Sequence, residues 1–526
     1  MTAIKLFRVA ATLLAMCAAS AIADVTVNPM FSDHMVLQRE RPLPVWGQAS
    51  PDEAVTVTFA GETTSTKTGA DGKWMVLLSP KEVSRQPQEL TIKGNNVVTL
   101  KDVLVGDVWL GMGQSNMDWS LSSTDRREAI EKMPHGMFDS IRLFKVSEVQ
   151  LDAPANEVKA TWTEAGTREI MSFSATLFYF GEALSQRHPD VPLGLIRSSV
   201  GATNLYCWIP NELRDQDPSA EYLRTWWTNA IKSWSAEKQA QRDRELETYE
   251  AQLKAWQQRK ENPPSDFKKP GELLGPKWSR RPSGLYNGMI APLQPFALRG
   301  LIWYQGEWDS KHDWVTVYHD MFVAFARSLR ERWAAASGVP RLGQFPIFLV
   351  QPPAREPNDG KYWPYMREVQ ERLATSVPDS GFVVTCDTND PNELHPREKS
   401  PIGRRLCLLA LAKAYNEQLA WRGPQLKSSK PEGDQLVLEF DTASDSLKSS
   451  DGQPLRHFEV AGDDGFYHAA SAEIRGQTVL VTSPQVKHPT TVRYAFMPAP
   501  VKPNFYNSAG LPAAPFRTDS LPNPPM

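Results

Sequence analysis

The 526-residue chain contains only four cysteines, which leaves little room for cysteine-based chemistry. Three of them, Cys207, Cys386 and Cys407, follow the first 23 residues, so the chain is not a disulfide scaffold. The odd number leaves at least one thiol free or paired between chains. CxxC, HExxH and Walker-loop motifs and a complete GxGxxG are lacking, and with them the strong signals for metal and nucleotide sites. We therefore expect no metal and no cofactor.

The chain also lacks an excess of positive charge and long apolar runs. Its formal net charge is −3 and no basic stripe is present, which argues against nucleic acid as a partner. Beyond residue 23, no stretch reaches the ~20 uninterrupted apolar residues of a membrane span. Nothing in the sequence indicates the oligomeric state.

Residues 1–23 have the pattern of a cleaved export signal. Lys5 and Arg8 form a basic start, a short apolar run follows, and Ala21-Ile22-Ala23 fits a small-x-small cleavage site. We therefore expect a periplasmic or secreted protein.

The remaining chain divides by pattern into three parts. Residues 24–104 and 424–526 consist of short alternating runs separated by turn residues, which predicts an N-terminal and a C-terminal β-module, both sandwich-like. Residues 105–423 alternate apolar strands with amphipathic helices, the signature of an α/β fold with a parallel sheet. Six strands are expected there: DVWLGM, SIRLFKV, PLGLIRSS, LRGLIWYQ, PIFLVQ and GFVVTCD.

A charged segment at about 211–275 interrupts this alternation. Leu246, Tyr249, Leu253 and Trp256 form one apolar stripe on it, which favours a solvated helix or hairpin lying on the core. A lid or a dimer contact is the alternative.

Ser115, in GMGQSNMDW directly after the first core strand, is the candidate nucleophile. A serine hydroxyl attacks a carbonyl efficiently only when a base removes its proton. Among the nine histidines, His395 in NELHPREK has the best setting, because it lies in a loop after the last core strand. Polar clusters at the ends of parallel strands are where ligands bind in such sheets.

An oxyanion hole also requires hydrogen-bond donors. The backbone N–H of Ser115 is one candidate, and that of Gly201 in SSVGATN is a second. The side-chain amide of Gln305 in WYQGEWD is a third. Gly201 and Gln305 follow other expected strands, so all three are predicted to lie at successive strand ends.

The motifs GQSNM, SVGATN, WYQGEWD and ELHPREK occur in the order found in the sialate O-acetylesterase-like branch of the SGNH (GDSL-type) hydrolases, which the chain resembles over nearly its whole length after residue 23. The resemblance implies a flavodoxin-like SGNH core. It also implies Ser115 as nucleophile, His395 as general base, and Gly201 and Gln305 as oxyanion-hole residues. The implied activity is metal-free removal of O-acetyl groups from sugars through an acyl-enzyme.

One position departs from the pattern of SGNH enzymes. They commonly carry an aspartate three residues before the histidine, where this chain has Asn392, while Glu393 matches an acidic position of the branch. Asp387 and Asp390 are other candidates for orienting His395. A backbone carbonyl is the remaining possibility, which would give a Ser–His dyad.

The expected function is therefore that of an exported carbohydrate esterase acting on an acetylated sugar or glycan. A plant cell-wall polysaccharide such as xylan or xyloglucan is the alternative to a sialic acid, whose carboxylate would require an arginine such as Arg355 or Arg397. A non-catalytic carbohydrate-binding protein is the rival from another class. Glu307 and Asp309 suggest a glycosidase pair, but we favour structural roles for both.

Overall fold

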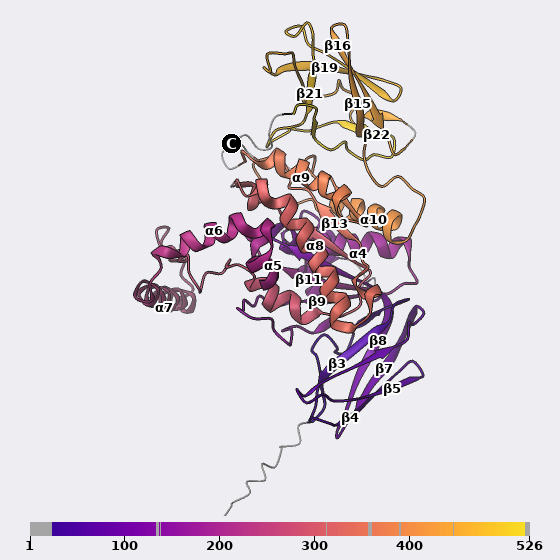
Figure 1. Cartoon of the computed structure of the whole chain (residues 1–526), viewed down its shortest axis with the longest axis vertical. Coiled ribbons are helices and arrows are strands. Elements are labelled where there is room, and N and C mark those ends of the chain that lie inside the picture. Colours follow the sequence, from indigo (N-terminus) through magenta and orange to yellow (C-terminus); the bar gives the residue numbers. More distant parts are fainter. Residues whose placement is uncertain are drawn as a thin grey trace, which may run out of the picture.

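The computed structural model describes residues 24–132, 136, 138–311, 313–355, 360–388, 391–444 and 446–520. The predicted export signal, residues 1–23, lies outside this part of the chain. Figure 1 shows N-terminal strands at one end of the long axis, an α/β region in the middle and C-terminal strands at the other end. Within the described ranges, no helix is both long enough and apolar enough to cross a membrane.

The N-terminal region is built of short strands in which buried and exposed residues alternate, as the period of two predicts. One antiparallel sheet has the order β1-β3-β6, and β4 pairs with β5 and β7 in a second group. The strands are β1 (Thr26–Val27), β2 (Val36–Gln38), β3 (Leu43–Gln48), β4 (Ala54–Phe59), β5 (Glu62–Lys67), β6 (Lys73–Leu78) and β7 (Ser84–Lys93).

The central sheet begins with β8 (Val97–Gly113), which pairs with β7 through its first half and with core strands through its second half. The predicted domain boundary after residue 104 therefore falls inside one continuous strand. The core order is β10-β9-β11-β8-β12-β13-β14, and all neighbours except β10 and β9 are parallel. The six expected strands are all present, as the end of β8 and as β9 (Ile141–Lys145), β11 (Leu193–Ser199), β12 (Gly300–Tyr304), β13 (Ile347–Val350) and β14 (Ser380–Val383); β10 is Trp162–Glu164.

Helices cover both faces of this sheet, which confirms the α/β class. Apolar residues of α4 (Ala175–Arg187) and α10 (Ser400–Ala414) share a buried cluster with Trp109. Residues of α8 (Val315–Ser337) and α9 (Trp363–Ser376) share another cluster with Leu110, which points to the opposite face. Shorter helices are α1 (Ser115–Asp118), α2 (Arg127–Glu131), α3 (Thr167–Met171), α5 (Asn211–Gln216) and α6 (Glu221–Ala230).

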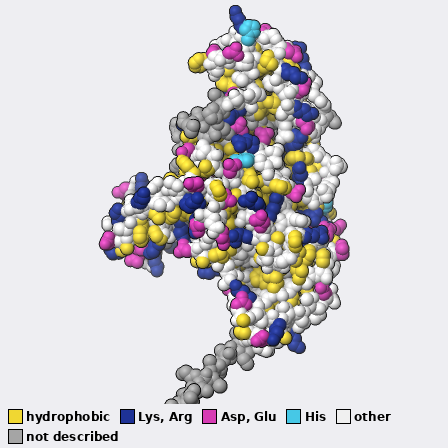
Figure 2. Space-filling view, in the orientation of Figure 1, with side chains coloured by type: hydrophobic (Ala, Val, Ile, Leu, Met, Phe, Trp, Pro, Cys, Tyr) yellow, Lys and Arg dark blue, Asp and Glu magenta, His cyan; other side chains and the backbone are white. Residues whose placement is uncertain are grey.

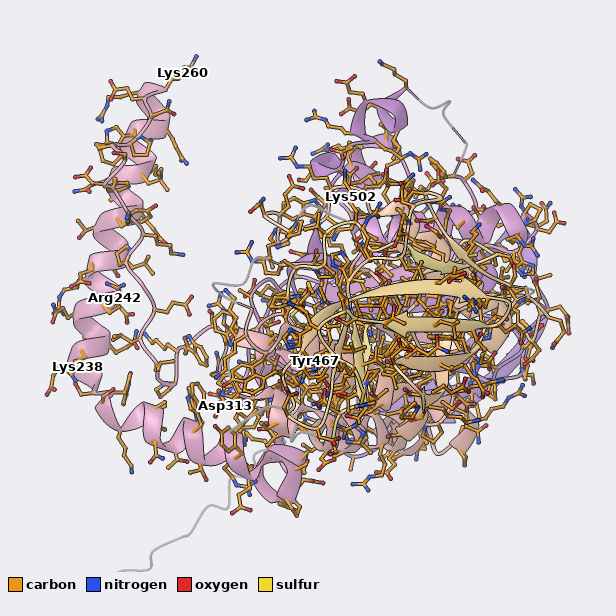
Figure 3. All side chains as sticks on the ribbon, turned by 90° about the horizontal axis from the view of Figure 1, so that it is seen from above. Lys238, Arg242, Lys260, Asp313, Tyr467 and Lys502 are labelled. Carbon is orange, nitrogen blue, oxygen red and sulfur yellow. The ribbon has the colours of Figure 1, made fainter. Side chains whose placement is uncertain are left out.

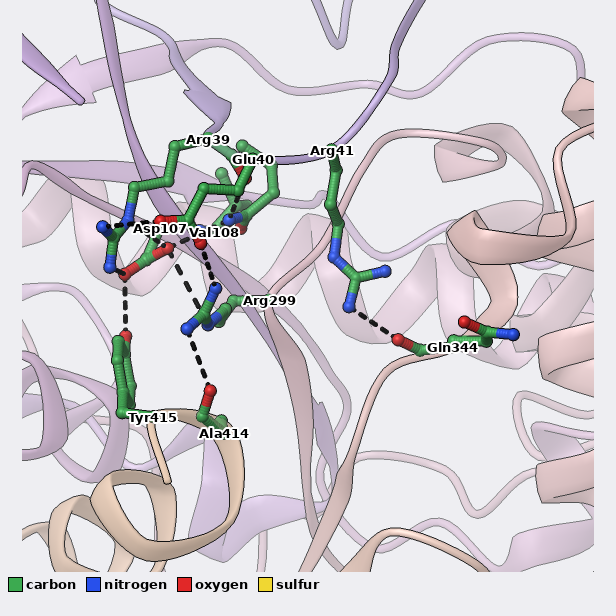
Figure 4. Close-up of polar contacts among 10 residues, drawn as sticks. Arg39, Glu40, Arg41, Asp107, Val108, Arg299, Gln344, Ala414 and Tyr415 are labelled. Atoms are coloured by element: carbon green, nitrogen blue, oxygen red, sulfur yellow. Dashed lines mark hydrogen bonds and ion pairs between the residues drawn. The ribbon is translucent and has the colours of Figure 1, made fainter. Parts of the chain in front are cut away.

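A buried carboxylate joins the N-terminal region to the core (Figure 4). Asp107, on β8, accepts hydrogen bonds from the guanidinium of Arg39 at 3.1 Å and from the hydroxyl of Tyr415 at 2.9 Å. Arg299, just before β12, pairs with Glu40 at 3.0 Å. Because these partners come from four separated segments, the network fixes the start of the parallel strands.

The charged insertion forms an arm rather than a helix lying on the core. Its helix α7 (Ala236–Arg259) has no buried residue and stands apart from the body of the protein (Figure 3). The apolar stripe is covered by the returning chain, because the rings of Tyr249 and Trp256 pack on Phe267 at centroid distances of 4.5 and 4.4 Å. The expected solvated helix is present, but in the described part of the chain it has no buried residue and does not lie on the core as expected.

The C-terminal region is again made of strands. Seven form an antiparallel sheet of order β15-β16-β20-β19-β18-β21-β23, and β17 pairs with β22. Leu436, Val460 and Phe505 belong to a separate buried cluster, so this region has its own core. The strands are β15 (Gln425–Glu432), β16 (Gln435–Asp441), β17 (Leu447–Ser449), β18 (Phe458–Ala461), β19 (His468–Arg475), β20 (Thr478–Thr482), β21 (Thr491–Tyr494), β22 (Phe505–Asn507) and β23 (Phe516–Arg517).

Candidate active site

Three neighbouring strands end beside one another, and each is followed by a predicted site residue. Ser115 follows β8, Gly201 follows β11 and Gln305 follows β12, where β11 and β12 flank β8 on its two sides. Gly113 at the end of β8 has a φ of +136°, and a side chain there would meet the carbonyl oxygen of Tyr304. Only glycine permits this close approach, so GMGQS is shaped to turn the chain directly before Ser115.

Ser115 and His395, separated by 280 positions, are neighbours in space. The Oγ of Ser115 lies 2.9 Å from Nε2 of His395, which is hydrogen-bond distance. The indole of Trp119, one turn beyond Ser115, stacks on the imidazole with a centroid distance of 4.3 Å and an interplanar angle of 21°. The fold therefore brings together Ser115 and His395, the two residues that the sequence analysis selected as candidate nucleophile and candidate base.

The imidazole of His395 lies in a half-buried, positively charged setting. Burial, and to a smaller extent the nearby charges of Lys399 and Arg355, lower the pKa of His395 to about 4. Desolvation and neighbouring cations both disfavour the imidazolium form. The ring is therefore neutral at pH 7, with a lone pair available to accept the proton of Ser115.

The acids proposed to orient His395 have other partners. The carboxylate of Glu393 lies 3.3 Å from Nε of Arg397, and within the described ranges no hydrogen bond joins it to the imidazole. Asp387 is held by two bonds from Arg405, at 2.7 and 2.6 Å, and by another from Tyr506. Asp390 lies outside the described residues. The structure thus brings the histidine to the serine without bringing Glu393 or Asp387 to the histidine.

Two backbone N–H groups beside the serine are unoccupied. In the described part of the chain, the N–H groups of Ser115 and Gly201 have no hydrogen-bond acceptor. A methyl group at position 201 would lie 3.6 Å from Cβ of Ser115, an ordinary contact distance. Glycine is therefore not required there by a clash, but it keeps open the space beside the hydroxyl.

The side-chain amide of Gln305 differs from the expected oxyanion donor. It is fully buried, and its Nε2 donates to the carbonyl of Thr203 at 3.0 Å and to the carboxylate of Asp309 at 2.5 Å. Its Oε1 accepts from the hydroxyl of Tyr318 at 2.7 Å. The amide would have to break these hydrogen bonds to reach an oxyanion. In this geometry it instead connects the segments that follow β11 and β12.

A buried polar network links the serine loop to the histidine loop. Asn116, next to Ser115, donates to Glu307 at 2.6 Å and to the carbonyl of Leu394 at 3.2 Å, and accepts from Nζ of Lys399 at 2.5 Å. Burial lowers the pKa of Lys399 to about 7 and raises that of Glu307. The favoured structural role of Glu307 agrees with this contact.

Sequence reasoning missed Lys399 and Asn116. A lysine four residues after a candidate base has the ordinary appearance of a surface charge, yet Lys399 is completely buried. The available signal was the Asn in GQSNM, since a residue adjacent to a nucleophile is well placed to tie neighbouring loops together.

Other tryptophans of the core, and an acidic group at its edge, have contacts that suit packing and ion pairs. Trp363 is fully buried, whereas Trp308 is half-buried beneath the guanidinium of Arg280. Away from Ser115, the group formed by His34, Asp102 and Glu164 has a ligand spacing that suits a metal. Its contacts favour an ion-pair network, however, because the guanidinium of Arg142 lies 3.0 Å from the carboxylate of Asp102 and 3.7 Å from that of Glu164.

Comparison with known proteins agrees with this chemistry. Residues 269–411 match the family model of the sialic acid-specific acetylesterase carbohydrate esterases. The sialate O-acetylesterase of Mus musculus is 29% identical over 442 residues, covering 74% of each chain, and that of Homo sapiens is 27% identical, covering 75% of this chain and 72% of the relative. A solved carbohydrate acetylesterase from Xanthomonas citri is 29% identical, with a TM-score of 0.77 over 94% of this chain and 100% of the other.

These similarities identify the protein as a carboxylic ester hydrolase that is similar to carbohydrate esterases. The similarities also confirm the resemblance to the sialate O-acetylesterase-like family that the motifs indicated, and they extend over about three quarters of the chain or more.

Proposed function

We propose that the protein removes O-acetyl groups from sugars by a serine acyl-enzyme mechanism in an SGNH-type core. The observation that carries this proposal is the 2.9 Å contact between Oγ of Ser115 and Nε2 of His395 at the strand ends. A hydroxyl placed against a neutral imidazole is the arrangement that nucleophilic acyl transfer requires. The export pattern of residues 1–23 adds that the reaction takes place in the periplasm or outside the cell.

In the first half-reaction, Oγ of Ser115 attacks the acetyl carbonyl carbon while its proton passes to Nε2 of His395. The carbonyl oxygen becomes an oxyanion that the N–H groups of Ser115 and Gly201 stabilise, because neither has another acceptor in the described chain. The intermediate then breaks its bond to the sugar oxygen. His395 returns the proton to that oxygen, which leaves an acetyl-serine and a free sugar hydroxyl.

In the second half-reaction, water takes the place of the sugar. His395 accepts a proton from the water as its oxygen attacks the acetyl-serine carbonyl, and the same two N–H groups stabilise the charge. Release of acetate restores the Ser115 hydroxyl. No step requires a metal or a cofactor.

The orientation of His395 rests in this proposal on its neighbours. Trp119 stacks on the imidazole ring, and Asn116 donates a hydrogen bond to the carbonyl of Leu394, the residue that precedes His395. These contacts suit a Ser–His dyad. Glu393 remains a candidate for a third member if it exchanges Arg397 for the imidazole. Gln305 contributes to the position of the serine loop, because its side-chain amide donates to Gln114, the residue before Ser115, and to Asp309.

The substrate is proposed at the level of an acetylated sugar or glycan. A sialic acid requires a cation for its carboxylate, and Arg355 lies close enough to His395 to influence its pKa, while Arg397 is exposed beside Glu393. An acetylated xylan or xyloglucan is the alternative. Release of acetate from O-acetylated sialic acid and from the two acetylated polysaccharides, measured side by side, separates these substrates.

Hydrolysis of 4-nitrophenyl acetate tests the catalytic proposal. Ser115→Ala and His395→Gln should each lower kcat by several powers of ten, because removal of one member of a catalytic set disables the whole. Ser123→Ala, an exposed serine of the same segment, is the matched control and should keep wild-type activity. If Ser115→Ala hydrolyses the ester as fast as wild type, the serine mechanism is wrong and the non-catalytic carbohydrate-binding alternative gains support.

A further inference from the structure

A second concave surface lies away from Ser115, where the N-terminal sheet β1-β3-β6 faces the core. It encloses a cleft of about 370 Å³, within the range of roughly 300–1,000 Å³ that is usual for small-molecule sites. Segments 155–157 and 291–295 and Ala336 form the wall on the core side. Figure 2 shows hydrophobic side chains gathered on the lower half of the molecule, the part in which Figure 1 places β3 against the core.

The floor of the cleft is one face of an antiparallel sheet. Trp46 on β3 pairs with Met75 on β6, and Gln48 pairs with Lys73, so these four side chains point the same way. Their neighbours along the strands are buried, whereas all four are at least partly accessible. The ring of Phe31 packs edge-on against Trp46 at 4.8 Å, which holds the indole in place. The floor is therefore a fixed aromatic platform.

Polar groups surround this platform. Lys73 and Gln48 rise from the floor, while Asn156, Glu157 and Gln294 line the opposite side. Nζ of Lys73 lies 3.4 Å from Oδ1 of Asn156, so the two sides approach within hydrogen-bond reach. The rim holds one cation and one carboxylate, whose charges balance. The rim therefore offers both hydrogen-bond donors and hydrogen-bond acceptors, and it has no excess charge that would favour a charged ligand.

A sugar ring has matching chemistry. Its apolar face stacks on an amphipathic aromatic surface, and the hydroxyls around its edge bond to amides and charged groups. We propose that this cleft binds a neutral stretch of glycan chain and so holds the enzyme on a polymeric substrate. The inference rests on the proposed function, and it favours the acetylated polysaccharide over a free sialic acid.

The cleft is separate from the catalytic centre. Two parts of its core wall, residues 291–295 and Ala336, come shortly before β12 and β13 and so lie at the edge of the sheet where these parallel strands begin, while residues 155–157 belong to the connection between β9 and β10. Ser115 lies at the edge where they end. The five residues of β12 alone separate the two edges by roughly 15 Å. A single sugar cannot reach both places, whereas a polymer or a carbohydrate matrix can engage them together, which raises its local concentration at the enzyme.

Binding is measured with the Ser115→Ala protein, so that turnover does not remove the ligand. Deacetylated xyloglucan and xylan serve as neutral probes and polysialic acid as the acidic probe in affinity electrophoresis. We expect retardation by at least one neutral polymer, at least a tenfold loss of affinity in Trp46→Ala, and no change in Phe466→Ala. Phe466, 71% exposed in the C-terminal region, is the matched control.

Met75→Ala and Gln48→Ala provide milder changes of the same surface if Trp46→Ala does not fold, and their melting temperatures are compared with wild type. In the protein that retains Ser115, these changes should leave 4-nitrophenyl acetate hydrolysis intact and lower kcat/KM only on polymer. Absence of binding to both neutral polymers, tighter binding of polysialic acid, or equal binding by wild type and all cleft variants overturns the inference. None of these results depends on whether Ser115 is the nucleophile, which the ester assay decides separately.

Discussion

The buried ammonium of Lys399 offers the sharpest test of how the site works. Lys399→Met keeps a long apolar side chain but removes both the charge and the 2.5 Å hydrogen bond to Asn116. Asn116 then lacks a donor for its Oδ1, which costs about 1–3 kcal/mol when a buried group is left unsatisfied. Relief from burying the ammonium offsets part of this cost. We therefore expect the variant to fold, with a melting temperature within several degrees of wild type.

The catalytic effect follows from the position of Asn116. Its contact with the carbonyl of Leu394 sets the histidine loop against the serine loop, so a looser Asn116 weakens the alignment of His395. We expect kcat on 4-nitrophenyl acetate to fall about 10- to 100-fold, corresponding to about 1.4–2.8 kcal/mol of transition-state stabilisation. Lys413→Met, a change of an exposed lysine on the same helix, is the control and should leave kcat unchanged.

The pH profile separates this role from a merely structural one. In the proposed mechanism His395 acts as a base only when neutral, so we expect kcat/KM to fall as the pH drops through its pKa of about 4. Burial, the larger cause of this low pKa, remains in Lys399→Met, but the repulsion from Lys399 is gone. The acid limb should therefore move to higher pH while staying below the ordinary value of 6.5. An unchanged acid limb together with an unchanged kcat would refute the reasoning.

The same lysine links stability to pH. Folding lowers the pKa of Lys399 from 10.5 to about 7, so between these values the unfolded chain holds a proton that the folded protein has lost. The free energy of unfolding contributed by this group therefore rises with pH across that window. Urea denaturation should show wild type gaining stability relative to Lys399→Met as the pH is raised from 7 to 10; a constant difference between the two proteins would contradict the burial of a titrating lysine.

Three further changes test the surroundings of the site. Glu393→Gln should lower kcat less than about tenfold, because the carboxylate pairs with Arg397, whereas loss of a true orienting acid costs about 10⁴-fold. Trp119→Leu should lower kcat on 4-nitrophenyl acetate by about tenfold through loss of the stack on His395, and a rise in KM confined to acetylated sugars would instead place the indole against substrate. Thiol reagents should leave the folded enzyme unmodified and active but label it in denaturant, as mass spectrometry can measure, because burial raises the pKa of each thiol to about 12; the buried free cysteines are Cys207, Cys386 and Cys407.

The meeting of Ser115 and His395 was predictable because Ser115 comes almost directly after β8, and His395 lies in the loop that joins the end of β14 to α10. Parallel strands in one sheet end at one edge, so a polar residue directly after a strand is committed to that edge wherever it occurs in the chain. The same rule predicted that Gly201 would lie beside Ser115. It did not predict which way the Gln305 amide would point, because a side chain at a strand end can turn toward the ligand or toward the core.

Other features depend on distant contacts that a local pattern does not contain. The change from short alternating runs to apolar strands and amphipathic helices predicted a domain boundary after residue 104, whereas β8 continues through this position because β7 and β2 pair with it there. The arm carries an apolar stripe that favoured a core contact, but Phe267 on the returning chain covers part of that stripe. In both cases the structure of a segment depends on a distant segment that packs or pairs with it, which the local sequence does not reveal.

The cations around His395 place a demand on the mechanism. In the proposed mechanism, attack by Ser115 turns the imidazole into an imidazolium, and the charges of Lys399 and Arg355 that lower the pKa of His395 oppose that change. A base with a pKa near 4 is neutral when needed but accepts a proton weakly. The proposal therefore expects the N–H groups of Ser115 and Gly201 to supply more of the rate enhancement than they would beside an ordinary triad. A negative charge that approaches Lys399 and Arg355 would raise the pKa of His395 and so make it a stronger base. The carboxylate of Glu393, or a carboxylate on the substrate, could supply that charge.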